Sequence, residues 1–195
     1  CVDEILILDS GSTDSTYDMS KKYSPKWFTS KWPGNYSHQR NISLELIETD
    51  WALVIDSDEF LDGRAASSIR KTMSVSDMLE IDIVWLGRKW LSDVISLKGT
   101  TLSVNSFGGQ YCFWPDPQPR LFRMNTIPYY QGVIHNLLQC DFARNASLII
   151  DESLYINHLR NLSFTLEERI SEVNKRNVVD PGNVHNIQLL PEQYG

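Results

Sequence analysis

The chain has 195 residues, of which 42% are hydrophobic and 22% are charged, and its formal net charge is -7. This length and composition suit one soluble globular domain with a sizeable core. The acidic balance and the lack of a basic stripe in the sequence argue against a nucleic-acid surface, and no apolar run is long enough to span a membrane.

Three cysteines occur, an odd number without close spacing, so the sequence shows neither a disulfide framework nor a zinc pattern. They favour a reducing compartment, and we therefore expect a cytoplasmic protein. Asn-x-Ser sequons begin at Asn35, Asn41, Asn145 and Asn161. Because Asn41 falls within an expected helix, we interpret these sequons as chance matches.

The first part of the chain alternates between expected strands and helices. Val2–Leu8 predicts a strand, and a turn of small residues beginning at Asp9 leads into a helix over about Ser15–Tyr23. The turn presents Asp9 at the carboxyl end of its strand. A short strand follows at Trp27–Thr29, and then a helix is expected over Ser37–Glu48.

The early turns of that second helix contain Arg40. The start of a helix attracts anions, because its backbone N–H groups point outward and its dipole is positive there. An arginine at this place predicts contact with an anionic ligand, and the alternative is an ion pair with Glu45 or Glu48 on the helix surface.

The stretch Trp51–Leu61 organises the expected site. Its apolar run Trp51–Ile55 predicts a strand that is buried on both faces, as in a parallel sheet, and Asp56, Asp58 and Glu59 follow at once. Neighbouring carboxylates repel each other unless a cation lies between them. Mg2+ and Mn2+ often bind one or two carboxylates together with substrate phosphates. The stretch therefore indicates a metal–diphosphate site, and a solvated acidic turn is the alternative.

A helix over about Ala65–Met73 completes the alternation, which favours a parallel sheet flanked by helices. Further along, strands follow one another without helices, which favours a mixed or antiparallel second half. The expected strands there are Ile81–Leu91, Val94–Phe107, Arg120–Arg123, Val133–Leu138 and Ser147–Ile156. A helix is expected over Phe164–Asn177, and the lack of repeats and linkers predicts one domain over residues 1–195.

Four segments, taken together and in this order, resemble family 2 glycosyltransferases of the GT-A fold. They are VDEILILDSGSTDST from Val2, HQRNISLELIETDWALVIDSDEFL from His38, WPDPQPRLFR from Trp114 with Gly132–His135 after it, and Ile156–His158 with a charged helix ending at Lys175–Asn177. The chain is most similar to the branch that includes lipopolysaccharide-core β-glucosyltransferases. It is also similar to glycosyltransferases of large algal viruses, for which the expected location is the host cytoplasm.

The resemblance implies an α/β fold of the GT-A (Rossmann-like) type. Its central sheet would be mixed but mainly parallel and flanked by helices, with a smaller antiparallel part on the acceptor side. Residues 1–78 would form the nucleotide-binding half, 79–177 the sugar and acceptor half, and 178–195 a tail. An Asn-Glu loop that touches the nucleotide in the family has no counterpart here, so we expect residues upstream of Cys1 to be missing.

The resemblance also implies an inverting transfer of a sugar from a nucleotide-diphosphate donor, such as a UDP-sugar, to a glycan, glycoprotein or glycolipid. A divalent cation, Mn2+ or Mg2+, would assist. Asp9 would contact the uracil ring or the ribose, and Arg40 the nucleotide or its phosphates. Asp56 would hold the ribose or the ion, and Asp58 would bind the ion directly. His158 would supply a further metal or phosphate contact, and an imidazole suits Mn2+ better than Mg2+.

An inverting transfer needs a base that takes the proton from the acceptor hydroxyl. Asp116 in the Trp-Pro-Asp turn is the first candidate, and Asp141 and Asp151 are weaker ones. Related chains often have His-Glu after the Gly-Val segment, whereas this chain has His135-Asn136. That departure puts a base at this position in doubt.

Other functions remain open at the level of sequence. A phosphohydrolase with an Asp-x-Asp nucleophile needs a Thr or Val shortly after the second Asp, but here Glu59-Phe60 follows. A nucleotidyltransferase shares the logic of strand and metal, but it usually carries a Gly-rich, Arg-bearing phosphate loop near its start. A non-enzymatic alternative is a sugar-binding module that keeps the fold around a dead site.

Overall fold

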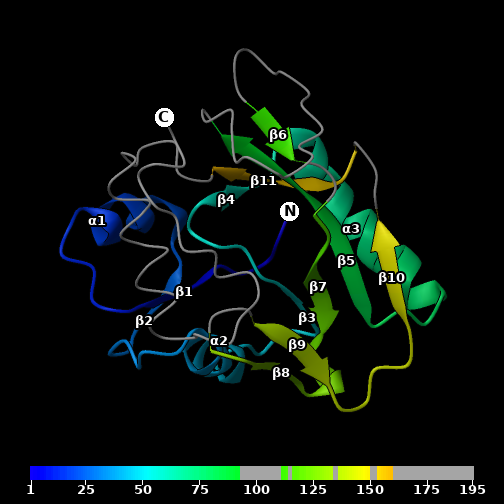
Figure 1. The fold of residues 1–195 in the computed structure, drawn as a ribbon, viewed down its shortest axis with the longest axis horizontal. Coiled ribbons are helices and arrows are strands. Elements are labelled where there is room, and N and C mark those ends of the chain that lie inside the picture. Colours follow the sequence, from blue (N-terminus) through cyan, green and yellow to red (C-terminus); the bar gives the residue numbers. More distant parts are fainter. Residues whose placement is uncertain (93–110, 114–115, 134–135, 150–152, 160–195) are drawn as a thin grey trace, which may run out of the picture.

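The computed structural model describes residues 1–92, 111–113, 116–133, 136–149 and 153–159 (Figure 1). These residues form a mixed α/β structure with one sheet of seven strands and two sheets of two strands. The extended pair expected at Val94–Phe107 and the helix expected at Phe164–Asn177 lie outside the described residues. None of the described helices has the length and hydropathy needed to cross a membrane.

The helices in chain order are α1 Thr16–Ser20, the 3-10 turn η1 Lys21–Tyr23, α2 Tyr36–Glu45, α3 Gly63–Met78 and the 3-10 turn η2 Met124–Thr126. The strands are β1 Leu6–Asp9, β2 Lys26–Thr29, β3 Trp51–Leu53, β4 Glu59–Phe60, β5 Ile83–Ser92, β6 Tyr111–Phe113, β7 Gln118–Arg123, β8 Pro128–Gln131, β9 Leu137–Cys140, β10 Ala146–Ile149 and β11 Tyr155–Leu159.

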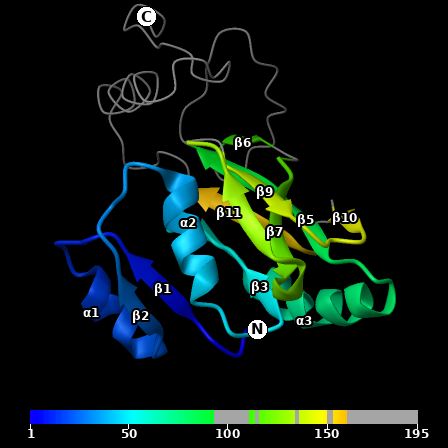
Figure 2. The same cartoon turned by 90° about the horizontal axis from the view of Figure 1, so that it is seen from below.

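The elements from β1 to β3 follow the predicted alternation of strands and helices. β1 and β2 pair in parallel with Asp9 opposite Thr29, and α1 lies between them in the chain. α2 begins after Asn35, whose side chain accepts a hydrogen bond from the His38 backbone N–H and so caps the helix. In Figure 2, α2 lies between the β1–β2 pair and the large sheet.

The large sheet is organised around β5. This strand pairs in parallel with β10 and β11 and antiparallel with β6 and β7. β3 pairs antiparallel with β7, and β4 pairs antiparallel with β11. The sheet is therefore mixed, and the expectation of a mainly parallel central sheet is not confirmed.

The position of β3 corrects one prediction. The apolar run at Trp51–Ile55 was expected to form a strand of a parallel sheet, but β3 ends the strand order and runs antiparallel to its partner β7. An apolar run predicts burial on both faces, and an antiparallel strand between two helical layers meets that condition equally well. The sequence alone does not reveal the partner strand that sets the direction.

The two faces of the sheet are covered by different helices. Leu121 and Phe122 are neighbours on β7, so their side chains point to opposite faces. Leu121 packs with Ala65 and Ile69 of α3, whereas Phe122 packs with Leu44 of α2. α3 is longer than expected, and it begins after Asp62, whose carboxylate accepts a hydrogen bond from the Ala65 N–H at 2.8 Å.

Three strands and one division were not predicted, and one of these strands is β6. β4 has only two residues, and β8 lies in a segment where no strand was expected. The stretch expected as one strand at Ser147–Ile156 contains β10 and the beginning of β11, which both pair with β5. β11 carries His158, so this division brings the histidine to the edge of the sheet where β4 lies.

Candidate active site

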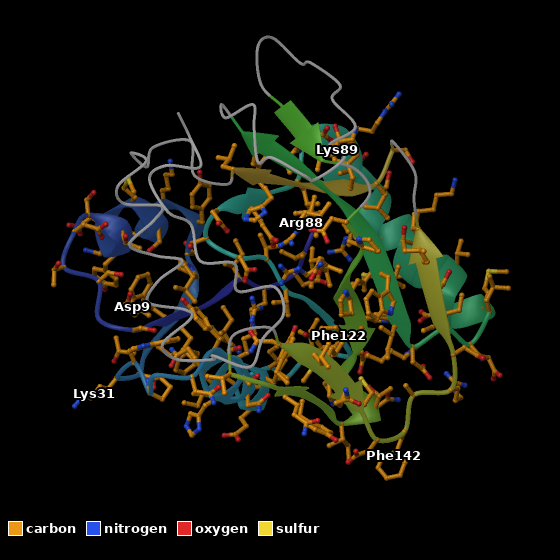
Figure 3. The ribbon with its side chains drawn as sticks, viewed as in Figure 1. Asp9, Lys31, Arg88, Lys89, Phe122 and Phe142 are labelled. Carbon is orange, nitrogen blue, oxygen red and sulfur yellow. The ribbon has the colours of Figure 1, made fainter. Side chains whose placement is uncertain are left out.

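The predicted site residues come from separate parts of the chain. Asp9 ends β1, Arg40 lies in α2, Asp56 and Asp58 lie between β3 and β4, Asp116 precedes β7, and His158 lies in β11. The structure connects Arg40, Asp56 and Asp116 through a chain of ion pairs and joins Asp58 to His158 directly. Asp9 lies to one side of this region, as its position relative to Arg88 in Figure 3 shows.

Asp56 is held between two arginines. Its Oδ1 is paired with Arg40 of α2, and its Oδ2 accepts a hydrogen bond from Nη2 of Arg120 of β7 at 2.7 Å. Burial raises the pKa of the Asp56 carboxyl, but the positive charges of Arg120 and Arg40 outweigh burial, so this pKa lies below its usual value. Asp56 is therefore held as an anion at the end of β3.

Asp58 and His158 form a pair across the short β4–β11 ladder. Nε2 of His158 lies 2.9 Å from Oδ2 of Asp58, and the Leu159 N–H donates to the Asp58 carbonyl at 2.7 Å. His158 is buried, while half of the Asp58 side chain is exposed. The hydrogen bond from His158 holds the pKa of Asp58 below its usual value despite partial burial. Two groups that can ligate a metal thus meet at the surface of the site.

Glu59 turns away from this pair and into the protein. Its side chain is completely buried, and its Oε1 accepts hydrogen bonds from Nη2 of Arg120 at 2.6 Å and from Nη1 of Arg88 at 2.9 Å. Its Oε2 accepts the backbone N–H of Asp56 at 3.0 Å. Buried charges in proteins are normally paired in this way, because an unpaired ion would be strongly destabilising.

Arg88 continues the chain from Glu59 to Asp116. Its Nε and Nη2 donate to Oδ2 of Asp116 at 2.9 and 2.6 Å, and Gln118 donates to the other oxygen at 3.1 Å. The linked residues form what we call the Glu59 cluster: Arg40, Asp56, Glu59, Arg88, Asp116 and Arg120. Through its ion pairs, the cluster links α2, the β3–β4 segment, β5 and β7.

The place of Arg40 is fixed by its neighbours in α2 and β8. Its guanidinium lies over the ring of Tyr130, 5.2 Å from the ring centre. The next residue, Asn41, accepts the Tyr130 N–H at 2.6 Å and donates to the Tyr130 carbonyl at 3.0 Å. Because these bonds occupy the Asn41 amide, the interpretation of its sequon as a chance match is supported.

Asp9 is held within its own turn. Its carboxylate accepts hydrogen bonds from the backbone N–H groups of Gly11 and Ser12 and from the Ser12 hydroxyl. These bonds, led by that of the Ser12 side chain, keep the pKa of Asp9 below its usual value. In the described part of the chain, no hydrogen bond or ion pair joins Asp9 to the Glu59 cluster, so its nucleotide role stays a prediction.

The donor set at Asp58 and His158 fits a divalent ion. A carboxylate oxygen and an imidazole nitrogen lie side by side there. Within the described ranges, no group of three metal-ligating side chains forms, and the Asp56 oxygens face arginines. Two protein ligands are enough where substrate phosphates complete the coordination, and an imidazole favours Mn2+ over Mg2+. The metal role of Asp56 itself stays a prediction.

Of the two other candidate bases, the described residues include only Asp141. Asp141 is exposed in a turn after β9. His135 and Asp151 lie outside the described residues. Asn136, the residue that departs from the family pattern, donates through its side chain to the Ser37 hydroxyl at 2.7 Å.

Three residues of the Glu59 cluster were missed as site residues. Glu59 was noticed only as a third carboxylate, and Arg120 only as part of the WPDPQPRLFR segment. Arg88 lies within the apolar strand β5. Charged residues inside apolar strands are rarely buried unless they are paired. Arg88 and Arg120 were thus visible as candidates for buried ion pairs, although their partners were not.

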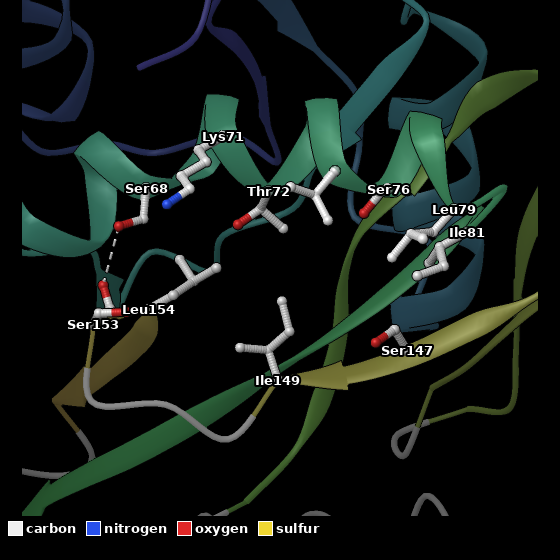
Figure 4. A pocket seen from close by; sticks show the side chains of 11 residues that line it. Ser68, Lys71, Thr72, Ser76, Leu79, Ile81, Ser147, Ile149, Ser153 and Leu154 are labelled. Atoms are coloured by element: carbon white, nitrogen blue, oxygen red, sulfur yellow. Dashed lines mark hydrogen bonds between the residues drawn. The ribbon is translucent and has the colours of Figure 1, made fainter.

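A cavity of about 300 Å³ lies elsewhere, between α3 and β10 (Figure 4). Ser68, Thr72 and Ser76 of α3 face Ser147 and Ile149 across it, and the Ser68 hydroxyl donates to the Ser153 carbonyl at 3.4 Å. None of the predicted site residues lines this cavity, so it is separate from the candidate active site.

The first part of the chain is similar to a known protein family. Residues 1–78 match the family described as Glycosyl transferase family 2. The SPbeta prophage-derived glycosyltransferase SunS of Bacillus subtilis (strain 168) is 34% identical over 83 residues, which are 42% of this chain and 20% of SunS. The lipopolysaccharide core biosynthesis glycosyltransferase LpsC of Rhizobium meliloti (strain 1021) is 33% identical over 79 residues, 38% of this chain and 29% of LpsC.

The fold agrees with the sequence match. The crystal structure of TarS 1-349 from S. aureus superposes with a TM-score of 0.52 at 16% identity, covering 93% of this chain and 57% of that one. Because the identity to TarS is low, this likeness shows a shared fold and nothing more. The segments aligned with SunS and LpsC span less than a third of those two proteins. Over residues 1–78 the chain is thus similar to family 2 glycosyltransferases, and its fold is similar to that of TarS.

Proposed function

We propose that the chain transfers a sugar, with inversion, from a UDP-sugar to a hydroxyl group of a glycan, glycoprotein or glycolipid, assisted by Mn2+ or Mg2+. The observation that carries the proposal is the Asp58–His158 pair at 2.9 Å, which lies two residues from the arginine-held Asp56. The Asp58–His158 pair offers two ligands for a divalent ion, and the arginines beside Asp56 offer positive charge for a diphosphate.

On the donor side, the site contains both negatively and positively charged side chains. Asp58 and His158 would hold the ion, which as a Lewis acid neutralises the charge that builds on the leaving diphosphate. Arg40 has a planar set of donors that suits phosphate oxygens, and it is placed by the Tyr130 ring. Asp56 would accept hydrogen bonds from the ribose or share the ion, and Asp9 would contact the uracil or the ribose.

On the acceptor side, Asp116 is the proposed base. Arg88 and Gln118 fix both of its oxygens. A base must be held within hydrogen-bond reach of the proton that it removes, so a fixed carboxylate suits this task. The same bonds also fit a purely structural residue, and the two roles differ in what an amide at this position does to transfer.

We also propose that different parts of the chain bind the nucleotide and the acceptor. Residues 1–78, which carry the family match, would bind the nucleotide, and residues 79–177 would bind the sugar and the acceptor. The name of LpsC refers to lipopolysaccharide core biosynthesis, which supports a glycan as one acceptor class. The cytoplasmic location is also a proposal; Cys1 and Cys140 are free thiols, as a reducing compartment would allow.

Calorimetric titration of UDP into the protein tests the donor side. We expect binding with MnCl2 and loss of that binding when EDTA is added, with weaker binding of ADP and CDP as controls for the base. Binding of a free glycan that is indifferent to the chelator, without any nucleotide binding, would instead indicate a sugar-binding module. Release of UDP from a panel of UDP-sugars would then identify the donor.

A further inference from the structure

We propose that Glu59 is a positioning residue that aligns the donor and acceptor sides of the site together. It acts through Arg120 on Asp56 and through Arg88 on Asp116. This inference rests on the proposed function, because it assigns a role in the transfer to a carboxylate that binds neither substrate nor metal.

Glu59 is unavailable as a metal ligand or a base. Both of its oxygens are used within the protein, and its side chain is completely buried. The Glu59 side chain at the start of β4 is buried, whereas Asp58, in the turn before it, is half exposed and contacts His158. Whatever Glu59 contributes to the reaction must pass through the groups that it contacts.

The first arm of Glu59 leads to the donor side. Nη2 of Arg120 is shared between Oε1 of Glu59 and Oδ2 of Asp56, at 2.6 and 2.7 Å. Oε2 of Glu59 also accepts the Asp56 backbone N–H at 3.0 Å. Glu59 therefore fixes both the backbone and, through Arg120, the carboxylate of Asp56, two residues before Asp58.

The second arm leads to the acceptor side. Arg88 donates to Glu59 through Nη1 and to Asp116 through Nε and Nη2, so one planar guanidinium sets the distance between the two carboxylates. A planar guanidinium fixes direction as well as charge. Because Arg88 and Arg120 share Oε1 of Glu59, a movement of this oxygen would displace Asp56 and Asp116 together.

Glu59→Gln is the appropriate variant, because it keeps the shape of the side chain and removes its charge. We expect UDP affinity in MnCl2 to fall by about tenfold or more, as when a partner that orients a metal ligand is lost, and kcat for transfer to fall as well. Asp82→Asn is the matched control. Asp82 is also a buried acid with two arginine partners, Arg123 and Arg144, but it lies just before β5.

A purely structural role would make the two variants alike. Asp82→Asn should lower the midpoint of thermal unfolding and leave UDP affinity and kcat per folded molecule unchanged. If Glu59→Gln lowers the midpoint and likewise leaves affinity and kcat unchanged, the positioning role is overturned. Wild-type protein that binds no UDP in MnCl2 would overturn the proposed function, and the positioning role with it.

The two arms can be separated, which also covers a Glu59→Gln variant that does not fold. Lysine keeps the charge of arginine but loses the planar fork. We expect Arg120→Lys to weaken UDP binding and Arg88→Lys to lower transfer while UDP affinity stays near that of the wild type. If both variants change UDP affinity and transfer in equal proportion, or change neither, Glu59 does not act through two arms.

Discussion

The described residues contain two chains of alternating acids and arginines, each centred on a buried acid, and only one of them lies at the proposed site. In the Glu59 cluster the order is Asp56, Arg120, Glu59, Arg88, Asp116. In the second, which we call the Asp82 cluster, it is Asp77, Arg123, Asp82, Arg144, Glu80. Each central acid is almost inaccessible, and each also accepts a backbone N–H.

The difference between the clusters lies in their outer acids. The acids of the Asp82 cluster occupy the end of α3 and the turn before β5, and Asp77 and Glu80 are mostly exposed. The outer acids of the Glu59 cluster are less exposed and far apart in sequence, and one of them neighbours the Asp58–His158 pair. A chain of ion pairs around a buried acid therefore does not indicate a function by itself. The function depends on what the residues at the ends of the chain contact.

The largest expected difference between the two regions comes from their exposed acids. Asp58 and Asp77 each have 51% of the side chain exposed, and each is paired with one basic residue. Asp58→Asn should remove Mn2+-dependent UDP binding and donor hydrolysis. The loss of affinity should exceed roughly 10–100-fold, which is the usual cost of removing a residue that only orients a metal ligand. Asp77→Asn should leave both unchanged. Retained Mn2+ dependence in Asp58→Asn would refute the metal role.

The next effect concerns Asp116, the proposed base at one end of the Glu59 cluster. Asp116→Asn should lower kcat for transfer by about 10²–10⁴, the range typical of general acid–base catalysis, while UDP affinity stays close to that of the wild type. Glu80→Gln, which changes an outer acid of the Asp82 cluster, should not change kcat. Transfer that survives in Asp116→Asn would mean that the base is elsewhere and that Arg88 holds Asp116 for structural reasons.

Both clusters also show what the sequence can and cannot predict. Except for β4, the elements up to α3 were predicted, with a shorter α3, because periodic apolar residues, caps such as Asp62 and short turns are local features. The release of Asp56 and Asp58 from a strand end follows from the same local pattern. The contact between Asp58 and His158 joins residues one hundred positions apart, and only the resemblance to a family suggested it.

The parts that were missed depend on long-range pairing. The direction of β3 is set by β7, and the two-residue strand β4 is recognised only through its pairing with β11. The partners of Arg88 and Arg120 are likewise fixed by strand register. Local patterns cannot supply register, because it depends on which strands meet. A buried arginine in a strand therefore predicts an acid nearby without naming it.

A smaller effect should separate Arg40, which pairs with the outer acid Asp56, from Arg144, which pairs with the outer acid Glu80 of the Asp82 cluster. Arg40→Lys keeps the charge beside Asp56 but loses the planar fork over the Tyr130 ring. UDP affinity in MnCl2 should fall about tenfold, which corresponds to roughly one charge-assisted hydrogen bond. Arg144→Lys should leave affinity unchanged. Equal affinities for wild type and Arg40→Lys would place Arg40 outside the phosphate site.

The smallest effect is the pH dependence of stability in the Asp82 cluster. Hydrogen bonds from Arg144, together with the charges of Arg144 and Arg123, hold the pKa of the Asp82 carboxyl below its usual value despite burial. A lowered folded-state pKa stabilises the protein fully above the unfolded value of about 3.9, and this contribution is lost as pH falls through the folded pKa. The difference in unfolding free energy between wild type and Asp82→Asn should therefore shrink below about pH 4, by at most roughly 1.4 kcal/mol per pH unit. Urea unfolding of both proteins between neutral and acid pH measures it, and a difference that does not change with pH would contradict the assignment.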